Sequence, residues 1–504
     1  MKKLGLLGLV VMFVALAMIP AGAEGVSIKE EGKALTLKLD VDAPWAFRSK
    51  DINVFHNAAG VGLNAAQESD ALMTPLVSLT TEWALKDKVT AVVELANLRL
   101  QLGAVGGTGT LDNAQYGAGQ NITTGFRQAY IKVEDFIADK LTMNYGIQPL
   151  KLTLRKGEGA FFADVSYSLS PSLKVPLDIS VAARSTTTRG YGEFSGLNFK
   201  YGNAAADNYD VGFFYGVTVE FPTAGGLRFE DRLLGFTFTY KLSGEDNVIK
   251  AVVAQASNAW TEMNALTIGV GADYFGAMPN KALEIYGEVY MQSGTASNAG
   301  WTATGAQADV DQAAQAYRFG AQYNFAQDLK PYVGLSYWFL SGGDDSARYK
   351  AGSAKYTENN HFVSYENSQS TLILEDNLYG LNLDSNYTAI KVEAGITTSF
   401  KLDKSGEASP LYVKLLLGQF SLNKEPLMTA ADPKTGLFTT DDGLGTEIDI
   451  VATLEATKNL SLSLGLGMLS GGDFFGSVRF TNAAGGTDSF DSMTMVIFGA
   501  KLSF

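Results

Sequence analysis

Apolar and polar residues alternate along much of this chain with a period of two. Residues 35–42 carry leucine or valine at every odd position and threonine, lysine or aspartate at every even one. Residues 460–467 alternate leucine with serine or glycine, and the last residues, 493–504, alternate in the same way and end on Phe504. Such a period is typical of a β-strand with one apolar and one polar face.

The alternation predicts eighteen strands. They cover residues 33–42, 75–85, 88–99, 125–135, 139–148, 191–201, 208–220, 231–242, 247–256, 264–274, 281–292, 316–325, 330–340, 386–401, 409–420, 445–457, 459–468 and 493–504.

Connections between these strands alternate between long and short. The longest covers residues 341–385, whereas residues 86–87 form one of the short turns. Short turns on one side and longer loops on the other are the pattern of outer-membrane barrels, in which the short turns are periplasmic. We therefore expect an all-β fold, a transmembrane antiparallel β-barrel of eighteen strands, with sixteen as the alternative count.

The two ends of the chain agree with export to a membrane. Residues 1–23 have Lys2 and Lys3, an apolar run and a small-residue cleavage pattern at 21–23, which predicts a secretory signal peptide rather than a membrane anchor. No later segment has the roughly 18 consecutive apolar residues of a membrane helix. Membrane strands must form a closed barrel to pair their backbone groups. Residues 24–504 are thus predicted to be a single barrel domain in the bacterial outer membrane, in contact with its lipid.

The composition narrows the functional classes. The chain has a net charge of −14, which argues against a nucleic-acid partner, and it has no cysteine. Its only histidines, His56 and His361, fall in predicted external loops, and no serine-hydrolase or metalloprotease motif is present. We expect no enzymatic activity, no metal and no cofactor.

Charged residues fall almost entirely on the predicted inward face, because a charge facing lipid is costly. We count nine basic and thirteen acidic inward residues. Those expected to line the pore are Lys132, Glu284, Glu288, Arg318, Lys391, Lys414, Glu447 and Asp449. Lys391 also shares a face with Glu393 on one strand, so the alternative is a salt bridge within the wall.

Residues 149–190 form a long connection that could fold into the barrel. They carry six basic and three acidic residues, whereas residues 341–385 carry three basic and seven acidic ones. We therefore hypothesise a basic constriction facing the acidic wall, and the alternative is that these charges only solvate loops and wall. The basic residues assigned to the constriction are Lys151, Arg155, Lys156, Arg184 and Arg189.

Several motifs resemble a known family. Residues 444–450 (L-G-T-E-I-D-I), the turn at 458–459 and residues 470–473 (S-G-G-D) are similar to the carboxy-terminal region of the alginate-export porin family. Residues 126–131 and 145–150 are similar to paired strands of that family and of other substrate-selective porins. The resemblance implies an eighteen-stranded monomeric channel that passes saccharides or other small anions. It also implies an arginine-rich lumen, from which the acidic excess counted above departs, so the solute stays open.

The sequence thus predicts an outer-membrane channel for passive diffusion of small hydrophilic solutes, such as saccharides or organic acids. Two alternatives are a structural or adhesive barrel that displays its loops, and an export pore for a secreted polymer. The strand that ends on Phe504 resembles the closing strand of outer-membrane barrels, which implies the barrel-assembly machinery as a partner. The oligomeric state, monomer or trimer, is left open.

Overall fold

The structure of the chain is a computed structural model. The described residues are 27–30, 33–49, 51–57, 60–66, 70–73, 76–86, 88–97, 124–148, 154, 193–203, 207–220, 228–242, 247–258, 263–275, 282–297, 309–342, 358–360, 362, 370–376, 383, 386–401, 408–424, 442–477, 480–481, 487–488 and 492–503. The predicted signal peptide, residues 1–23, lies outside them.

Eighteen strands make up the wall, and each matches one predicted segment. They are β2 (Lys33–Asp42), β7 (Leu76–Lys86), β8 (Val89–Asn97), β9 (Thr124–Val133), β10 (Leu141–Gln148), β11 (Glu193–Gly202), β12 (Tyr209–Glu220), β13 (Arg228–Lys241), β14 (Val248–Asn258), β15 (Met263–Phe275), β16 (Leu283–Ser297), β17 (Asp309–Asn324), β18 (Tyr332–Leu340), β20 (Tyr387–Lys401), β21 (Ala408–Leu422), β22 (Gly443–Thr457), β23 (Leu460–Gly471) and β26 (Ser492–Ser503).

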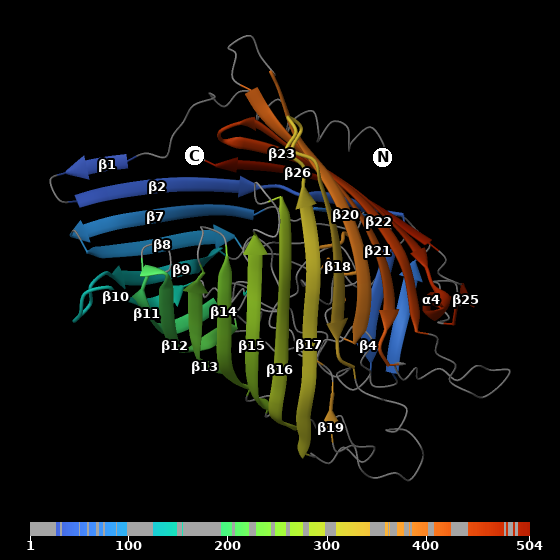
Figure 1. Cartoon of the computed structure of the whole chain (residues 1–504), viewed down its shortest axis with the longest axis horizontal. Coiled ribbons are helices and arrows are strands. Elements are labelled where there is room, and N and C mark those ends of the chain that lie inside the picture. Colours follow the sequence, from blue (N-terminus) through green and yellow to red (C-terminus); the bar gives the residue numbers. More distant parts are fainter. Residues whose placement is uncertain are drawn as a thin grey trace.

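The wall closes on itself. Neighbouring wall strands pair antiparallel in chain order, so that β11 to β17 lie side by side (Figure 1). At the seam, β26 pairs with β23 along one edge and with β2 along the other, where Asp40 lies opposite Ser503. The predicted antiparallel barrel of eighteen strands is confirmed. Closure satisfies the backbone groups that an open sheet edge would leave unpaired in lipid.

The largest boundary difference is at the start of β17. This strand begins at Asp309, whereas the alternation predicted a start at residue 316. The added residues pair with the end of β16, but Asp311 and Gln315 are exposed and polar. This first part of β17 has no row of large apolar residues on its outer face. The search for alternating apolar residues therefore could not detect it.

Shorter elements lie outside the predicted strands. β1 (Ser27–Glu30) pairs with β2, and the others lie in the long connections. These are β3 (Trp45–Arg48), β4 (Asp51–Asn57), β5 (Gly60–Ala66), β6 (Asp70–Met73), β19 (Glu358–Asn359), α4 (Asp473–Ser477), β24 (Phe480–Thr481) and β25 (Thr487–Asp488). Among the described residues, no helix has the length and apolar character that a membrane crossing requires.

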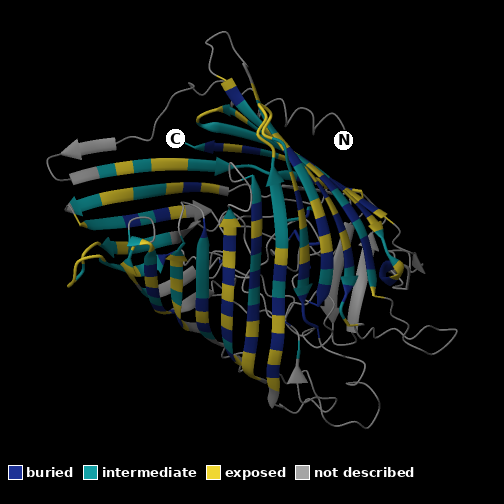
Figure 2. Cartoon of the chain, in the orientation of Figure 1, coloured by how far each residue is buried: buried dark blue, intermediate teal, exposed yellow. Residues whose placement is uncertain are grey.

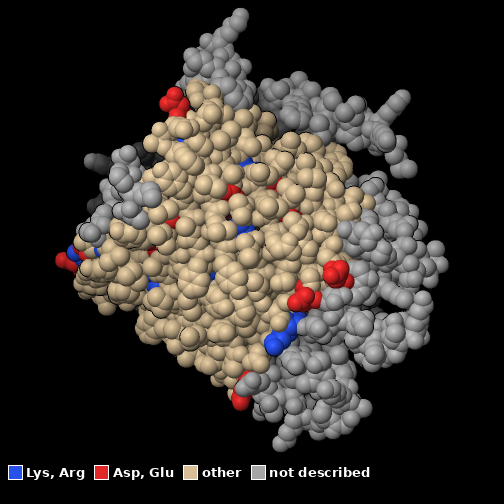
Figure 3. Space-filling view, turned by 45° about the vertical axis from the view of Figure 1, so that its right-hand side comes forward, with Lys and Arg blue, Asp and Glu red and all other residues tan. Residues whose placement is uncertain are grey.

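Side chains alternate across the wall as the sequence pattern predicts. Buried and exposed residues follow one another along β15, β16 and β17 (Figure 2). The exposed partners are large and apolar, such as Ile268, Met291 and Leu335, whereas Glu288 and Arg318 are buried on the inner face. Figure 3 shows a predominantly uncharged outer surface, with the projecting charged side chains near its edge. The outer face therefore has the composition of a lipid-facing surface.

An arginine placed on this outer face should destabilise the barrel. Leu335 is 55% exposed and lies in the middle of β18. We expect Leu335→Arg to lower the free energy of unfolding in lipid by about 2–4 kcal/mol, because the guanidinium loses its hydration. Urea titration of the lipid-reconstituted protein measures this change. Leu329→Arg, in a short turn, is the matched control; an equal loss there would contradict a lipid-facing assignment.

Ion pairs join neighbouring short turns. Lys140 Nζ donates to Asp207 Oδ1 at 2.5 Å between the turn after β9 and the turn after β11. This hydrogen bond lowers the pKa of Asp207 and raises the pKa of Lys140. The pair therefore stabilises the fold between these two pKa values, and its contribution is lost as the pH falls through the lower one or rises through the higher one.

Because both side chains are exposed, the effect of this pair is expected to be small. Asp207→Asn should lower the thermal midpoint slightly near neutral pH and leave it unchanged in acid, where the parent carboxyl is protonated. Thermal denaturation across this pH range measures the difference. A constant difference from acid to neutral pH would contradict the assignment.

Candidate functional site

A row of charged and aromatic side chains crosses the inner wall at one height. In the strand register, Glu288 of β16 lies opposite Arg318 of β17, and Arg318 lies opposite Trp338 of β18. Further along the wall, Gly418 of β21 lies opposite both Lys391 of β20 and Glu447 of β22. Lys391 in turn lies opposite Ser336, two residues from Trp338. Backbone pairing therefore brings residues of five wall strands into one belt, which we call the charge row: Glu288, Arg318, Trp338, Lys391 and Glu447.

The indole of Trp338 lies between the two cations of the row. The guanidinium carbon of Arg318 is 4.3 Å from the centroid of this ring, and Lys391 Nζ is 3.6 Å from it. Trp338 Nε1 donates to Ser336 Oγ at 3.0 Å, which orients the ring. An aromatic face attracts cations through its quadrupole, most strongly where water is excluded. Trp338 thus holds both cations in place.

Glu288 balances the charge of Arg318. Arg318 Nη1 lies 3.6 Å from Glu288 Oε1, and both side chains are 2% exposed. Tyr290 donates its hydroxyl to Glu288 Oε2 at 3.0 Å. The pair is buried and supported by the hydrogen bond from Tyr290, so its stability depends on the presence of both partners.

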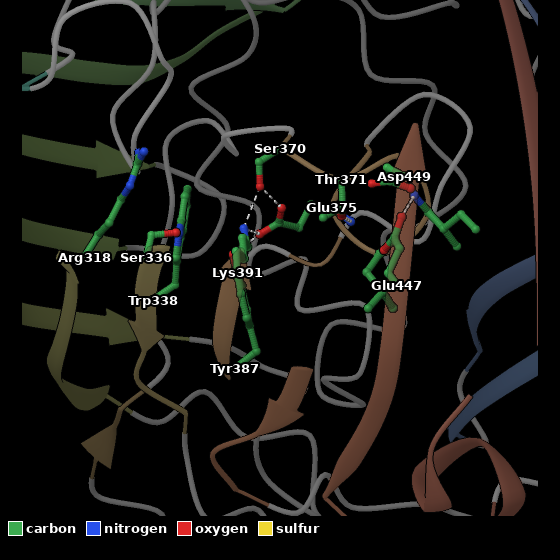
Figure 4. Close-up of polar contacts among 12 residues, drawn as sticks. Arg318, Ser336, Trp338, Ser370, Thr371, Glu375, Tyr387, Lys391, Glu447 and Asp449 are labelled. Atoms are coloured by element: carbon green, nitrogen blue, oxygen red, sulfur yellow. Dashed lines mark hydrogen bonds and ion pairs between the residues drawn. The ribbon is translucent and has the colours of Figure 1, made fainter. Parts of the chain in front are cut away.

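The charge of Lys391 is balanced by a residue outside the wall. Lys391 Nζ lies 2.5 Å from Glu375 Oε1 and donates to Ser370 Oγ at 2.6 Å. Glu375 also accepts the hydroxyl of Tyr387 at 2.7 Å and the hydroxyl of Ser370 at 2.5 Å. Glu375 belongs to residues 370–376, which form bends within the long connection between β18 and β20 and which we call the docked segment. Figure 4 shows Ser370, Glu375 and Lys391 converging.

Two carboxylates of β22 hold the backbone of the docked segment. Glu447 accepts the amide of Ile373 at 2.6 Å and the amide of Leu374 at 2.9 Å. Asp449 accepts the amide of Leu372 at 3.1 Å. Three consecutive amides of this segment are therefore satisfied by the wall, as buried amides must be.

A glycine of β23 makes room for the docked segment. A Cβ atom on Gly467 would lie 3.1 Å from Leu372 Cβ and 3.2 Å from Ile373 Cγ1. A side chain here would require the segment to shift by a few tenths of an ångström. This close approach is the packing reason for glycine here.

The interior at this height also contains apolar side chains. Phe362, Ile373, Leu374 and Leu383 of the long connection form one buried cluster with wall residues that include Trp338. The sequence assigned charged residues to the inner face, but the aromatic members of that face were not predicted. The sequence position of Trp338 could have identified it as inward, because it lies two residues from the inward Ser336 and therefore on the same face of the strand. The inner wall thus combines charge with apolar packing.

The structure brings five of the predicted pore-lining residues together. Glu288, Arg318, Lys391 and Glu447 belong to the charge row, and Asp449 lies beside it. All five are at most 3% exposed, so they contact protein rather than an open channel.

Three other predicted pore-lining residues lie apart from the row. Glu284 is inward and 7% exposed, whereas Lys132 bonds Glu134 and Lys414 bonds Glu393, each as a more exposed pair. The alternative of a wall salt bridge between Lys391 and Glu393 is wrong. Lys391 pairs with Glu375 of the docked segment, and Glu393 pairs with Lys414 of the adjacent strand.

The predicted constriction residues fall outside the described part of the chain. These are Lys151, Arg155, Lys156, Arg184 and Arg189. Within residues 149–190 the structure describes Leu154, which is 3% exposed. Its Cβ lies 2.8 Å from the position of a Cβ added to Gly271, and Gly271 is opposite Glu288. Leu154 therefore contacts the inner wall next to the charge row.

The second long connection differs from its sequence-based description. Residues 341–385 were predicted to be an acidic external loop, yet residues 370–376 lie inside the wall against β20 and β22. Among the described residues, no group of His, Cys, Asp and Glu has the arrangement of a metal site.

Comparisons with known proteins give structural matches without sequence matches. No family model and no curated protein matches the chain. Acinetobacter baumannii OccAB1 is similar with a TM-score of 0.50 at 11% identity, covering 96% of this chain and 99% of that one. Pseudomonas aeruginosa OprD, an outer-membrane protein, has a TM-score of 0.46 at 10% identity, over 96% and 97%. Pseudomonas aeruginosa OccK2, solved with glucuronate, has 0.44 at 10%, over 93% and 96%. At such identities the similarity to OccAB1 concerns the fold alone. The predicted barrel fold is confirmed at that level.

Proposed function

We propose that the chain is a passive channel, a porin, of the bacterial outer membrane that admits small hydrophilic solutes. The observation that carries this proposal is the closed barrel of eighteen strands, apolar outside and charged inside. A barrel of this size encloses an aqueous channel unless loops fill it. Transmembrane barrels with short turns on one side are typical of the outer membrane. No step of bond chemistry is part of this function.

The charge row supports a small solute over a polyanion. Its cations, Arg318 and Lys391, are each balanced by a carboxylate, Glu288 and Glu375. The row therefore offers no uncompensated positive charge to a long polyanion such as alginate. We therefore propose saccharides or organic acids as solutes, and the relation to alginate-export porins stays a prediction. Export of a polymer would use the same barrel in the opposite direction.

Display of surface loops is the competing function. The apolar cluster inside the wall favours it, because a barrel filled by its own loops needs no solute. Single-channel recording of the purified mature protein in planar bilayers separates the two functions. Stepwise conductance supports the channel, and a silent, correctly folded barrel supports display. Assembly through the carboxy-terminal strand, and a monomeric or trimeric state, remain part of the proposal.

We also propose that residues 149–190 narrow the channel with their basic side chains. The burial of Leu154 against the inner wall supports this placement. Rings of charge select ions by sign, so Arg155→Glu should shift the reversal potential under a salt gradient towards cation selectivity. Lys458→Glu, in a short turn, is the control. Unchanged ion selectivity in Arg155→Glu would remove the basic constriction from the proposal.

A further inference from the structure

Glu375 occupies a complete carboxylate-binding site. Its carboxylate is 2.5 Å from the Lys391 ammonium and accepts the hydroxyls of Tyr387 and Ser370. Glu375 is 0% exposed and Lys391 is 3% exposed, so these bonds form away from water. Lys391 and Tyr387 belong to the wall strand β20, whereas Glu375 and Ser370 arrive with the docked segment. The wall therefore offers two strong donors to a carboxylate that the chain itself supplies.

The docked segment is attached to the wall by exchangeable polar contacts and by the apolar packing of Ile373 and Leu374. Its backbone forms no strand pairing with β20, β22 or β23, and it consists of bends. Its polar contacts with the wall include the Glu375 site at one end and the amides held by Glu447 and Asp449 at the other. Water or a solute can replace each of these hydrogen bonds. The segment is thus a separate body seated on the inner wall.

We propose that the docked segment is a gate and that Glu375 is its internal ligand. A small organic carboxylate in the channel competes with Glu375 for Lys391 and Tyr387, and the segment leaves the wall when it loses this contact. The inference rests on the proposed channel function and names its solute-dependent step. A ligand shifts a two-state equilibrium only through its different affinity for the two states. Here the difference in affinity arises because Glu375 fills the site in the closed state. In the open state the site is available to the solute.

The site also defines what the solute must carry. Lys391 and Tyr387 require an anionic group with two acceptor oxygens. The rings of Trp338 and Phe420, 3.6 Å and 5.5 Å from Lys391 Nζ, flank it with apolar faces. A neutral polyol lacks the charge that would displace a carboxylate from a buried ammonium. Gluconate and sorbitol, which differ at one carbon, form a suitable pair of probes.

A reversible cross-link tests whether the segment moves. The chain has no cysteine, so an introduced pair has no competing thiols. Leu372→Cys with Gly467→Cys places the two Cβ positions 3.1 Å apart, so a shift of the segment by a few tenths of an ångström brings them to the roughly 3.5–4.5 Å of a disulfide. In planar bilayers, gluconate should raise the open probability of the reduced pair at least tenfold, and oxidation should abolish this response. Reductant should restore it, and each single cysteine variant should be insensitive to oxidation.

Removal of the internal ligand gives a second, independent readout. Glu375→Gln weakens the contact with Lys391, so this variant should open without solute and lose most of its response to gluconate. Glu393→Gln, which removes a carboxylate paired with Lys414 on the wall, should retain the response. Sorbitol should have no effect on any of the variants.

The outcomes separate the gate from the channel. Two results together would overturn the gate and leave the channel intact. The parent protein would conduct steadily, and the double cysteine variant would respond to gluconate equally when oxidised or reduced. Opening by sorbitol as strong as opening by gluconate would overturn the role of Glu375 as an internal ligand. A parent protein without any conductance would overturn the channel, and the gate with it.

Discussion

Glu447→Ala is expected to release the docked segment from the wall and to lower the free energy of unfolding by about 2–6 kcal/mol. Glu447 is 0% exposed and accepts the amides of Ile373 and Leu374. Each buried amide left without an acceptor costs about 1–3 kcal/mol. The chain avoids part of this cost if the segment undocks into water. The loss of stability is then smaller, and the amides of the segment become exposed.

Two measurements distinguish a full loss of stability from undocking of the segment. Urea titration of the lipid-reconstituted protein gives the free energy of unfolding, and hydrogen exchange gives the protection of the two amides. Glu455→Ala removes an exposed carboxylate from the same face of β22 and should change stability by less than about 0.5 kcal/mol. Asp449→Ala should have a smaller effect than Glu447→Ala, because Asp449 accepts one amide at 3.1 Å. Full amide protection and unchanged stability in Glu447→Ala would contradict the contacts described above.

Trp338→Ala should cost about 3–5 kcal/mol of unfolding free energy, the range for truncating a buried tryptophan. Trp338 is 1% exposed and packs in the apolar cluster. Its loss also removes the ring that lies between Arg318 and Lys391, so their mutual repulsion is no longer offset by two cation–π contacts. We expect the charge row to become disordered as well as the barrel to be less stable.

Trp83→Ala is the matched control for this substitution. Trp83 is 49% exposed on the outer face, where lipid refills the space of a removed side chain, so the cost should be clearly smaller. Trp338→Phe keeps an aromatic face and should recover part of the loss. The free energies of unfolding of the three variants in lipid provide the test. Equal losses for Trp338→Ala and Trp83→Ala would show that the interior at Trp338 is no better packed than the lipid contact.

The inward charges could be found from the sequence, but their partners could not. Parity along β20 and β22 assigned Lys391 and Glu447 to the inner face, because side chains alternate strictly along a strand. The partner of Lys391 is Glu375, which lies in a connection without any period. Its position depends on the path of that connection through the barrel. The nearest candidate in the sequence, Glu393, bonds Lys414 instead.

The order of strands, their inner and outer faces and the side of the short turns were all determined by the sequence alone. These properties follow from the period-two pattern, which is local, and from the need to pair every backbone group in lipid. The tertiary structure decided which strands meet at which height, and it placed Glu375 at Lys391 and the amides of the docked segment at Glu447 and Asp449. Those contacts join residues as many as 77 positions apart. They form because closure of the barrel brings distant inner faces and one long connection into the same enclosed space, which no local pattern encodes.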